Sequence, residues 1–310
     1  MNIVELKNTR IGKVCVVGVG GGGRNAMFNM LKDNYTGVNL IMVDTNIKGF
    51  GHKNSPIIET QIGKKLTEGL GAGADPKVGR EAALENKDEI KDVLKDSKLV
   101  FITAGMGGGT GTGAAPVVAE ICKEIGAITI AVVSKPFSFE GKKRARQAEL
   151  GIDKLMQYAD TFIAFSNDKL REIAPRDAKM LEMFIEADKI LSQSVKGILD
   201  LIIHPGHVNI DLADFKTTIK NGNRSIVGMG IADGKNKISQ AVQKATTNPL
   251  IENISIGNSE RILLLSTATL TAVTCTMGSP GSNVQTAGMN IYWHSPANAA
   301  TSAPPAIKSG

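Results

Sequence analysis

Aromatic residues and cysteines are scarce in this chain. Of its 310 residues, 4% are aromatic and 42% are hydrophobic, so the core has to be built mainly from aliphatic side chains. The cysteines, Cys15, Cys122 and Cys275, are odd in number, far apart and without metal-ligand spacing. This usage excludes a disulfide framework and fits a reducing cytoplasm, where we expect the protein to work.

Long apolar runs and concentrated charge are also missing. No secretory leader and no run long enough to span a bilayer is visible, so we expect no membrane span. The net charge is +6 and the isoelectric point about 9.1, but lysine and arginine are scattered, with only residues 142–144 clustered. Without an aromatic stacking platform, this pattern predicts no dedicated nucleic-acid site. His204 and His207 lack an acidic partner, so no metal site is expected there.

Glycine, by contrast, is abundant, and much of it lies in loops. Residues 105–113 read GMGGGTGTG, between an apolar run at 98–104 that predicts a buried strand and a helical pattern at 114–125. Bare backbone N–H groups at the start of a helix form an anion site. The segment therefore predicts phosphate binding, and its length suggests more than one phosphate. It contains no lysine and so differs from the common P-loop, which leaves the charge to backbone dipoles and a metal ion.

A second glycine run, at residues 18–23, permits a different interpretation. It fits the dinucleotide fingerprint, and Asp44 ends the next predicted strand, where an NAD enzyme places its ribose-binding acid. The first 50 residues alone favour an NAD-binding oxidoreductase. A dehydrogenase, however, has no reason to carry the further phosphate loop at 105–113, and no hydride-transfer site is obvious.

Strand and helix patterns alternate along most of the chain. Strands are predicted at 14–17, 38–43, 99–103, 128–134 and 161–165, and helices at 25–33, 81–95, 114–124 and 141–158. This alternation predicts a doubly wound parallel sheet in an α/β domain, with its ligand beyond the carboxyl ends of the strands.

The sequence also predicts how the chain divides into domains. We expect a nucleotide-binding domain at 1–180, a central helix at 181–205 with its pattern over 181–203, and a second, smaller α/β domain at 206–266. That smaller domain includes a helix at 238–245 and a strand at 261–266. Residues 267–310 are rich in small polar residues and poor in charge, and they fit either an altered C-terminal end or a disordered tail.

The segment 105–113 resembles the signature of the tubulin and FtsZ superfamily of filament-forming GTPases. Segments 16–26, 69–80, 135–144 and 209–214 are similar to further motifs of the FtsZ family, in the same order. The resemblance implies GTP or GDP as ligand, Mg²⁺, head-to-tail self-assembly, and a division-ring scaffold in the cytoplasm at the division site. It also allows accessory partners, although the family's C-terminal partner-binding tail is not visible in this chain.

The resemblance assigns nucleotide contacts to residues in several loops. Those toward the phosphates and ribose are Gly20, Gly21, Gly22, Asn25, Gly71, Ala72, Gly73, Gly107, Gly108, Gly109, Thr110 and Gly111. Locally, 71–73 also fits an ordinary turn between helices. Pro136 would set a turn, and Glu140 and Arg144 would hold the sugar, although their i, i+4 spacing equally fits a surface ion pair. Asp44 departs from the family's usual order of polar residues and brings a charge nearer the nucleotide.

Asn167 and Asp188 are the guanine readers that the resemblance implies. A carboxylate can accept from both the ring N–H and the exocyclic amine of guanine. Phe184 lies one helical turn before Asp188 and would place an aromatic face beside the base. Without the resemblance, Phe184 fits plain core and Asp188 a solvated helix face.

Asp211 and Asp214 are the predicted catalytic residues, assisted by Asn209. Locally the two acids fit helix N-capping. The resemblance instead places them in a loop that inserts into the next subunit and orients water against the γ-phosphate, so that hydrolysis requires assembly. An altered C-terminal region leaves a second interpretation open, a non-hydrolysing filament subunit or an assembly inhibitor.

Overall fold

A computed structural model describes the chain at residues 14–32, 38–51, 55–175, 177–203, 212–219, 224–232, 236–247, 261–268 and 287–295. The chain divides into two compact units, Met1–Asn221 and Gly222–Gly310. Each unit is described by itself.

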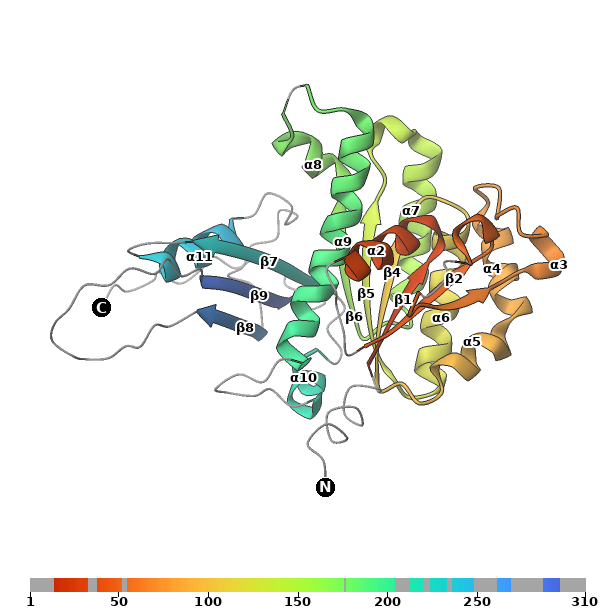
Figure 1. Ribbon diagram of the computed structural model, residues 1–310, viewed down its shortest axis with the longest axis horizontal. Coiled ribbons are helices and arrows are strands. Elements are labelled where there is room, and N and C mark those ends of the chain that lie inside the picture. Colours follow the sequence, from red (N-terminus) through yellow and green to blue (C-terminus); the bar gives the residue numbers. More distant parts are fainter. Residues whose placement is uncertain are drawn as a thin grey trace, which may run out of the picture. The chain divides into compact units, whose positions relative to one another are not determined.

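The first unit is built on a six-stranded parallel sheet with the strand order β3-β2-β1-β4-β5-β6 (Figure 1). Its strands are β1 (Val14–Val19), β2 (Asn39–Asp44), β3 (Ile58–Gln61), β4 (Leu99–Gly105), β5 (Ile128–Lys135) and β6 (Thr161–Ser166). The central strands are almost continuous runs of buried side chains, as expected for a parallel sheet covered on both faces. The order places β1 beside β4, and therefore the two glycine-rich segments at neighbouring strand ends.

Helices cover both faces of this sheet. The described helices of this unit are α2 (Gly20–Lys32), α3 (Lys64–Thr67), α4 (Pro76–Glu85), α5 (Lys87–Leu94), α6 (Thr110–Glu124), α7 (Lys142–Leu155), α8 (Asn167–Ile173), α9 (Met180–Ile203) and α10 (Leu212–Ile219), with short 3₁₀ turns η1 (Ile47–Gly49) and η2 (Ser138–Glu140). On one face α6 contacts the sheet and is flanked by α4, α5 and α7, whereas α2 and α9 pack together on the other (Figure 1). The predicted doubly wound α/β sheet is confirmed.

The core on the α6 face shows why these elements associate. Alternate β1 residues, Cys15, Val17 and Val19, pack into one cluster with aliphatic residues of β4 and α6, and each is at most 1% exposed. Val14 and Val16, the intervening residues of β1, are also buried, so this strand is covered from both sides. The core is largely aliphatic, as the scarcity of aromatics predicts.

Several predicted helix boundaries are wrong, including the end of the helix predicted at 141–158, which lies at Leu155. The predicted helices at 25–33 and 114–124 begin at Gly20 and Thr110, because the glycine runs themselves form the first turns of α2 and α6. The single helix predicted at 81–95 is two helices, α4 and α5, with the break at Asn86. There the buried amide oxygen of Asn86 accepts the N–H of Gly63 at 2.8 Å, a tertiary hydrogen bond that local periodicity does not reveal.

The second unit contains an antiparallel sheet and one described helix. Its strands are β7 (Arg224–Ala232), β8 (Arg261–Ala268) and β9 (Ala287–Ser295), in the order β7-β9-β8. Helix α11 (Lys237–Thr246) packs on β7 and β9. The predicted helix at 238–245 and strand at 261–266 are confirmed. Strand β9 lies inside 267–310, the segment for which the sequence left an altered end or a tail open.

Candidate functional site

The two glycine runs meet where β1 and β4 end. Helix α2 begins directly after β1, and α6 begins shortly after β4. A Cβ on Gly20 would lie 2.8 Å from the backbone nitrogen of Gly111, and one on Gly22 would lie 3.0 Å from that of Gly105. Because any side chain there would force the two segments apart, glycine is required by close approach. Gly20 also has a φ of +68°, a conformation that L-residues rarely adopt.

The third predicted loop joins the same cluster. A Cβ on Gly109 would lie 2.8 Å from the Cβ of Ala72 and 3.0 Å from the backbone nitrogen of Asp75. Asp75 then caps α4, where its carboxylate accepts the N–H of Lys77 at 2.9 Å. Residues 71–73 are therefore not an isolated turn, because they lie against the glycine-rich segment 105–113. Gly71 and Gly73 both have positive φ values, 98° and 57°.

Hydroxyl groups and one proline fix the shape of the 105–113 segment. The N–H of Gly107 donates to Thr112 Oγ1 at 2.8 Å, and a Cβ on Gly107 would lie 3.2 Å from Pro136 Cγ. Gly108, by contrast, has open space around it. The hydroxyls of Thr110 and Thr45 are 2.7 Å apart, which links the end of β2 to the start of α6. Sequence reasoning missed Thr45, although its position directly after a strand end was the signal that could have found it.

Asp44 is buried and paired. It is 3% exposed, and its Oδ2 lies 3.5 Å from Nη1 of Arg24 on α2. Burial raises the pKa of this carboxyl, while the backbone N–H of Asn46 and the charge of Arg24 oppose that rise. The carboxylate that the sequence placed near the nucleotide is thus already held by a guanidinium group.

Glu140 and Arg144 form the ion pair that their spacing allowed. Glu140 Oε2 contacts Nη1 of Arg144, and Glu140 Oε1 accepts the N–H of Phe137 at 2.9 Å. The Arg144 side chain is 48% exposed and that of Glu140 is 10% exposed. Both side chains therefore contact each other beside the 105–113 segment, where a Cβ on Gly107 would lie 2.9 Å from the backbone oxygen of Arg144.

The predicted base-side residues come from different helices. The amide of Asn25, on α2, donates to Asp188 Oδ2, on α9, at 2.9 Å. Burial raises the pKa of Asp188 to about 6, and the hydrogen bond from Asn25 works against that rise. Phe184 meets the rings of Phe137 and Phe139 edge to face, with centroids 5.2 and 6.3 Å away.

Asn167 stands apart from the Asn25–Asp188 pair. It is the first residue of α8 and is 7% exposed, and no hydrogen bond joins it to Asp188 among the described contacts. The structure therefore joins one predicted base-side residue, Asp188, to Asn25, which was predicted toward the phosphates and ribose, and it places Phe184 in an aromatic cluster one turn away.

The predicted catalytic residues cannot be placed in the same way. Asn209 and Asp211 lie outside the described residues, and Asp214 lies in α10 with its side chain outside the description. These assignments stay predictions. Within the described ranges no cluster of three His, Cys, Asp or Glu side chains could hold a metal ion. His204 and His207 also fall outside those ranges.

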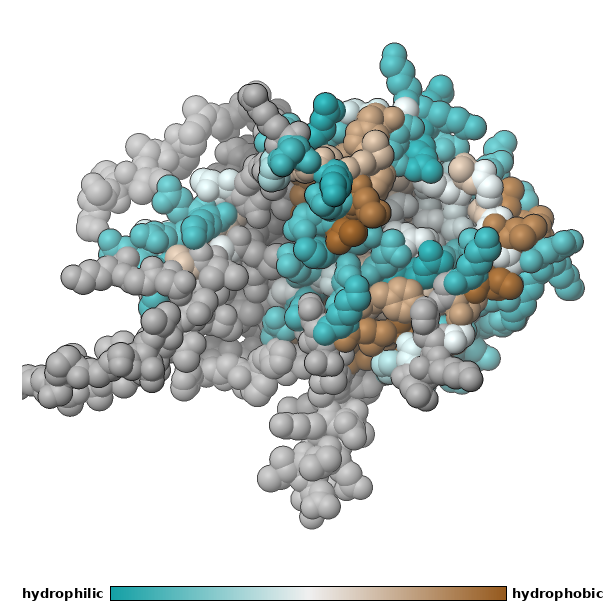
Figure 2. Space-filling view, turned by 45° about the horizontal axis from the view of Figure 1, so that its top comes forward, coloured by the Kyte–Doolittle hydropathy of each residue, from teal (hydrophilic) through white to brown (hydrophobic). Residues whose placement is uncertain are grey.

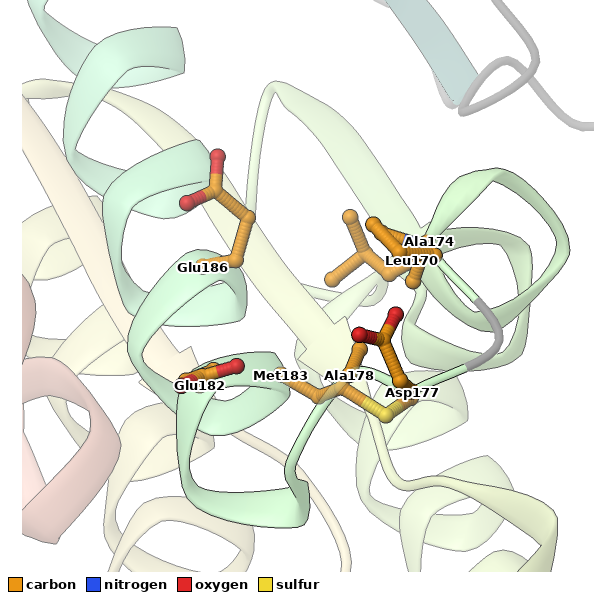
Figure 3. Close-up of a pocket in the computed structure, with 8 residues that line it drawn as sticks. Leu170, Ala174, Asp177, Ala178, Glu182, Met183 and Glu186 are labelled. Carbon is orange, nitrogen blue, oxygen red and sulfur yellow. The ribbon is translucent and has the colours of Figure 1, made fainter.

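A pocket of about 440 Å³ lies between α8 and α9, on the helix pair that carries Asn167 and Asp188. Figure 3 shows Leu170 of α8 and Ala174, directly after that helix, facing Glu182 and Glu186 of α9 across it. Its lining includes none of the predicted nucleotide contacts. The pocket is therefore separate from the loop cluster.

Exposed apolar side chains occur on segments next to the loops. Leu70, which directly precedes the 71–73 turn, is 79% exposed, and Leu181 and Ile185 near the start of α9 are 70% and 47% exposed. Figure 2 shows hydrophobic patches set among hydrophilic side chains over the described part of the face it views. In the part of the chain that the structure describes, no helix is long and apolar enough to cross a bilayer.

Backbone loops at neighbouring strand ends, beside polar side chains from two helices, define a doubly wound α/β domain of the nucleotide-binding class. The comparison with known families makes the assignment specific. Residues 13–175 match the family described as "Tubulin/FtsZ family, GTPase domain", and the chain belongs to this family. The family takes the place of the NAD-binding alternative that the first 50 residues allowed.

Relatives agree with this assignment along most of the chain. The cell division protein FtsZ of Aquifex aeolicus is 45% identical over 252 residues, which are 81% of this chain and 68% of that protein. An empty FtsZ dimer from M. jannaschii is 34% identical, with a TM-score of 0.82 over 95% of this chain and 92% of that chain. CetZ1 from Haloferax volcanii, a GDP-bound monomer, shares the fold at 21% identity and a TM-score of 0.75, covering 92% of this chain and 95% of that chain.

Proposed function

We propose that this protein is a cell-division GTPase that assembles head to tail into filaments and hydrolyses GTP at a site completed by the neighbouring subunit. GTP would bind where the three loops converge, with its phosphates on the backbone N–H groups of 107–111 and its base toward Asn25 and Asp188. By family resemblance we place the protein in the cytoplasm at the division site.

The observation that carries this proposal is that carboxylates around the loops are already bonded to groups of the same chain. Asp44 is paired with Arg24, Asp75 caps α4, and Glu140 is paired with Arg144. Each of these acids is occupied by a structural contact within its own chain. Phosphoryl transfer to water needs a group that positions the water. A neighbouring subunit that brings Asp211 and Asp214 would supply that group.

Exposed apolar residues support self-association at this edge. Leu70, directly before the 71–73 turn, and Leu181, near the start of α9, are 79% and 70% exposed and so are free to be covered by another subunit. A subunit that docks there would bury them and close the nucleotide from bulk water. The relatives include an FtsZ dimer from M. jannaschii, which is consistent with self-association of this chain.

Mg²⁺ is the metal that the family resemblance implies. Proteins commonly hold it through one or two oxygen ligands, with phosphate oxygens and water completing the octahedron. The hydroxyls of Thr45 and Thr110 at the junction of two loops are oxygen donors of this kind, so the residues present fit such an ion. When bound, the ion would neutralise charge on the phosphates, while the chain's own loops hold and orient them.

The test is phosphate release from GTP as a function of protein concentration. A shared site predicts turnover that rises steeply above a threshold concentration, with GTP binding already complete below it. Turnover per subunit that is constant from the lowest concentration would place the catalytic groups within one chain and contradict the intersubunit site. Tight GTP binding without turnover would favour the non-hydrolysing subunit.

A mixing experiment sharpens this test. Asp214→Ala should keep GTP affinity and lose turnover, whereas Gly20→Ala should lose GTP binding but still present Asp214 to a neighbour. Mixing the two inactive variants should restore part of the turnover, because an intact nucleotide site would then meet an intact acid. If the mixture stays inactive while each variant remains folded and Asp214→Ala binds GTP, the assignment of Asp214 to a neighbouring site is wrong.

A further inference from the structure

A second hollow, of about 580 Å³, lies on the sheet face covered by α4, α6 and α7, away from the α8–α9 pocket. Helix α6 lies between the other two because it contacts both (Figure 1). We call the hollow the α4–α7 furrow. The residues that matter for its chemistry are Lys77 and Arg80 of α4, Pro116 and Val117 of α6, and Leu150 and Lys154 of α7.

Close packing of the three helices fixes this furrow in place. A Cβ on Gly113 of α6 would lie 2.0 Å from the backbone oxygen of Pro76 at the start of α4. One on Gly151 of α7 would lie 2.4 Å from Thr112 Cγ2. These glycines let α4 and α7 approach the first turns of α6 closely. The furrow is therefore preformed, and its volume is in the range of ligand and peptide sites.

The furrow carries a small excess of positive charge. Lys77, Arg80 and Lys154 each make no ion pair with any described residue. Two carboxylates, Asp75 and Glu120, also line it, so the cations among the lining residues outnumber the anions by one. Asp75 accepts the N–H of Lys77 as the cap of α4, and Glu120 lies 3.9 Å from the ammonium of Lys87. An occupant thus meets cations on both walls.

Its apolar parts favour a protein occupant over a nucleic acid. Leu150 is 54% exposed at the furrow, above a floor that includes Pro116 and Val117. The ring of Tyr158, the one aromatic residue that lines the furrow, is covered by the ammonium of Lys123 at 5.7 Å from its centroid. That ring does not offer a free platform for stacking a base, whereas a partly exposed leucine between cationic walls suits an acidic segment with apolar residues.

We propose that the α4–α7 furrow docks an acidic amphipathic helix of a partner protein. Apolar residues at i, i+3 and i+7 of that helix would cover Leu150 and the α6 floor. Its flanking carboxylates would face Lys77 and Arg80 on one wall and Lys154 on the other. The proposal does not rest on the GTPase proposal, because the cations and the exposed leucine that carry it are not among the predicted nucleotide contacts.

The test uses the full chain and a synthetic probe. The probe is a fluorescein-labelled peptide of about four helical turns with leucine at those positions and glutamate and alanine elsewhere. Titration should give a saturable rise in fluorescence anisotropy that weakens as salt is raised from low to physiological ionic strength. A scrambled peptide of the same composition should bind at least about tenfold more weakly, because it cannot present one apolar face.

Charge-reversal variants then decide whether the furrow is the site. Lys154→Glu and Arg80→Glu should each weaken peptide binding by about tenfold or more. The matched control is Lys98→Glu, since Lys98 is exposed, does not line the furrow and has no ion-pair partner among the described residues. Circular dichroism and thermal melting of each variant show whether it is folded.

Three outcomes would overturn the proposal. The first is peptide binding that survives both charge reversals or that Lys98→Glu weakens equally. The second is a labelled oligonucleotide that binds as tightly as the peptide with the same sensitivity to Lys154→Glu, which would make the furrow a general polyanion site. The third is absence of peptide binding together with loss of self-association in Lys154→Glu, measured by sedimentation, which would assign the furrow to a second copy of the chain.

Discussion

The two sides of the candidate nucleotide site consist of different groups, backbone on one side and side chains on the other. The phosphate side consists of backbone and glycine, where Gly20, Gly22 and Gly109 allow segments to approach within about 3 Å of where a Cβ would be. The base side consists of side chains on separate helices, where Asn25 of α2 meets Asp188 of α9. A backbone site depends on the space between segments, whereas a side-chain site depends on the functional group and its protonation state. Substitutions on the two sides should therefore weaken GTP binding in different ways.

The largest effect is expected on the phosphate side, from Gly20→Ala. The added Cβ would lie 2.8 Å from the backbone nitrogen of Gly111 and push the starts of α2 and α6 apart. A hydrogen bond from the backbone to a charged phosphate is worth about 1.5–3 kcal/mol, so the loss of more than one predicts at least about 100-fold weaker GTP binding. Isothermal titration calorimetry measures this affinity.

Gly126→Ala is the matched control for this prediction. Gly126 also has a positive φ, 75°, but nothing lies within 4 Å of its added Cβ. Both variants should lose about 1–2 kcal/mol of unfolding free energy from backbone strain. Gly20→Ala should lose more because of its clash with Gly111, and only this variant should lose nucleotide affinity. Equal GTP affinity in the two variants would remove the first glycine loop from the site.

A smaller, pH-dependent effect is expected on the base side. The pKa of Asp188 is about 6, above its ordinary value of 3.8, so the carboxyl binds its proton more tightly in the folded protein. The Asp188 carboxyl therefore stabilises the folded, nucleotide-free protein most at low pH. Its contribution to the free energy of unfolding is lost as the pH rises from about 4 through 6. Guanine recognition needs the ionised carboxylate, so GTP affinity should increase over the same range as pH rises.

Asp188→Asn should weaken GTP binding by about tenfold at neutral pH, since the amide replaces an acceptor oxygen by a donor. It should also flatten the pH profile of GTP affinity around 6. Asn25→Ala is the comparison variant. Because the hydrogen bond from Asn25 lowers the pKa of Asp188, its removal should move the midpoint of that profile upward. An Asp188→Asn profile identical to that of the parent chain would show that Asp188 does not read the base.

The smallest effect is expected from Thr45→Val. It removes the hydroxyl that lies 2.7 Å from that of Thr110 but leaves the glycine backbone untouched. A neutral hydrogen bond contributes about 1 kcal/mol, which corresponds to roughly fivefold weaker GTP binding if the pair orients the phosphate side. A loss as large as that of Gly20→Ala would contradict a phosphate side made mainly of backbone, and competition with a fluorescent GTP analogue distinguishes the two.

The glycine runs of the candidate phosphate side could be recognised from the sequence more readily than the contacts of the candidate base side. Glycine runs between a buried strand and a helix can be recognised locally, because the strand end, the helix start and the missing Cβ atoms are all close in sequence. The hydrogen bond between Asn25 and Asp188 joins residues far apart in the chain, and no local pattern indicates it. The ion pair between Glu140 and Arg144 could be expected from their i, i+4 spacing, since one helical turn brings such side chains together.

Helix boundaries were the least predictable part of the fold. The amphipathic pattern over 81–95 continues through Asn86, yet α4 ends there, at a residue whose side-chain oxygen accepts the N–H of Gly63. The contact of Thr45 was equally hard to predict, because its partner Thr110 lies far away in the sequence, at the start of α6. In both cases the deciding contact is a hydrogen bond between segments that only the folded sheet brings together.

The sequence by itself determined the alternation of strands and helices, the aliphatic core and the glycine loops at the strand ends, because burial pattern and backbone freedom are properties of each residue and its near neighbours. The tertiary structure alone decided which loops meet, that Asp44 is held by an arginine of another element, and that three cations without an ion-pair partner among the described residues line one furrow. These depend on the strand order and on helix packing, which set the distances between side chains that the sequence keeps apart.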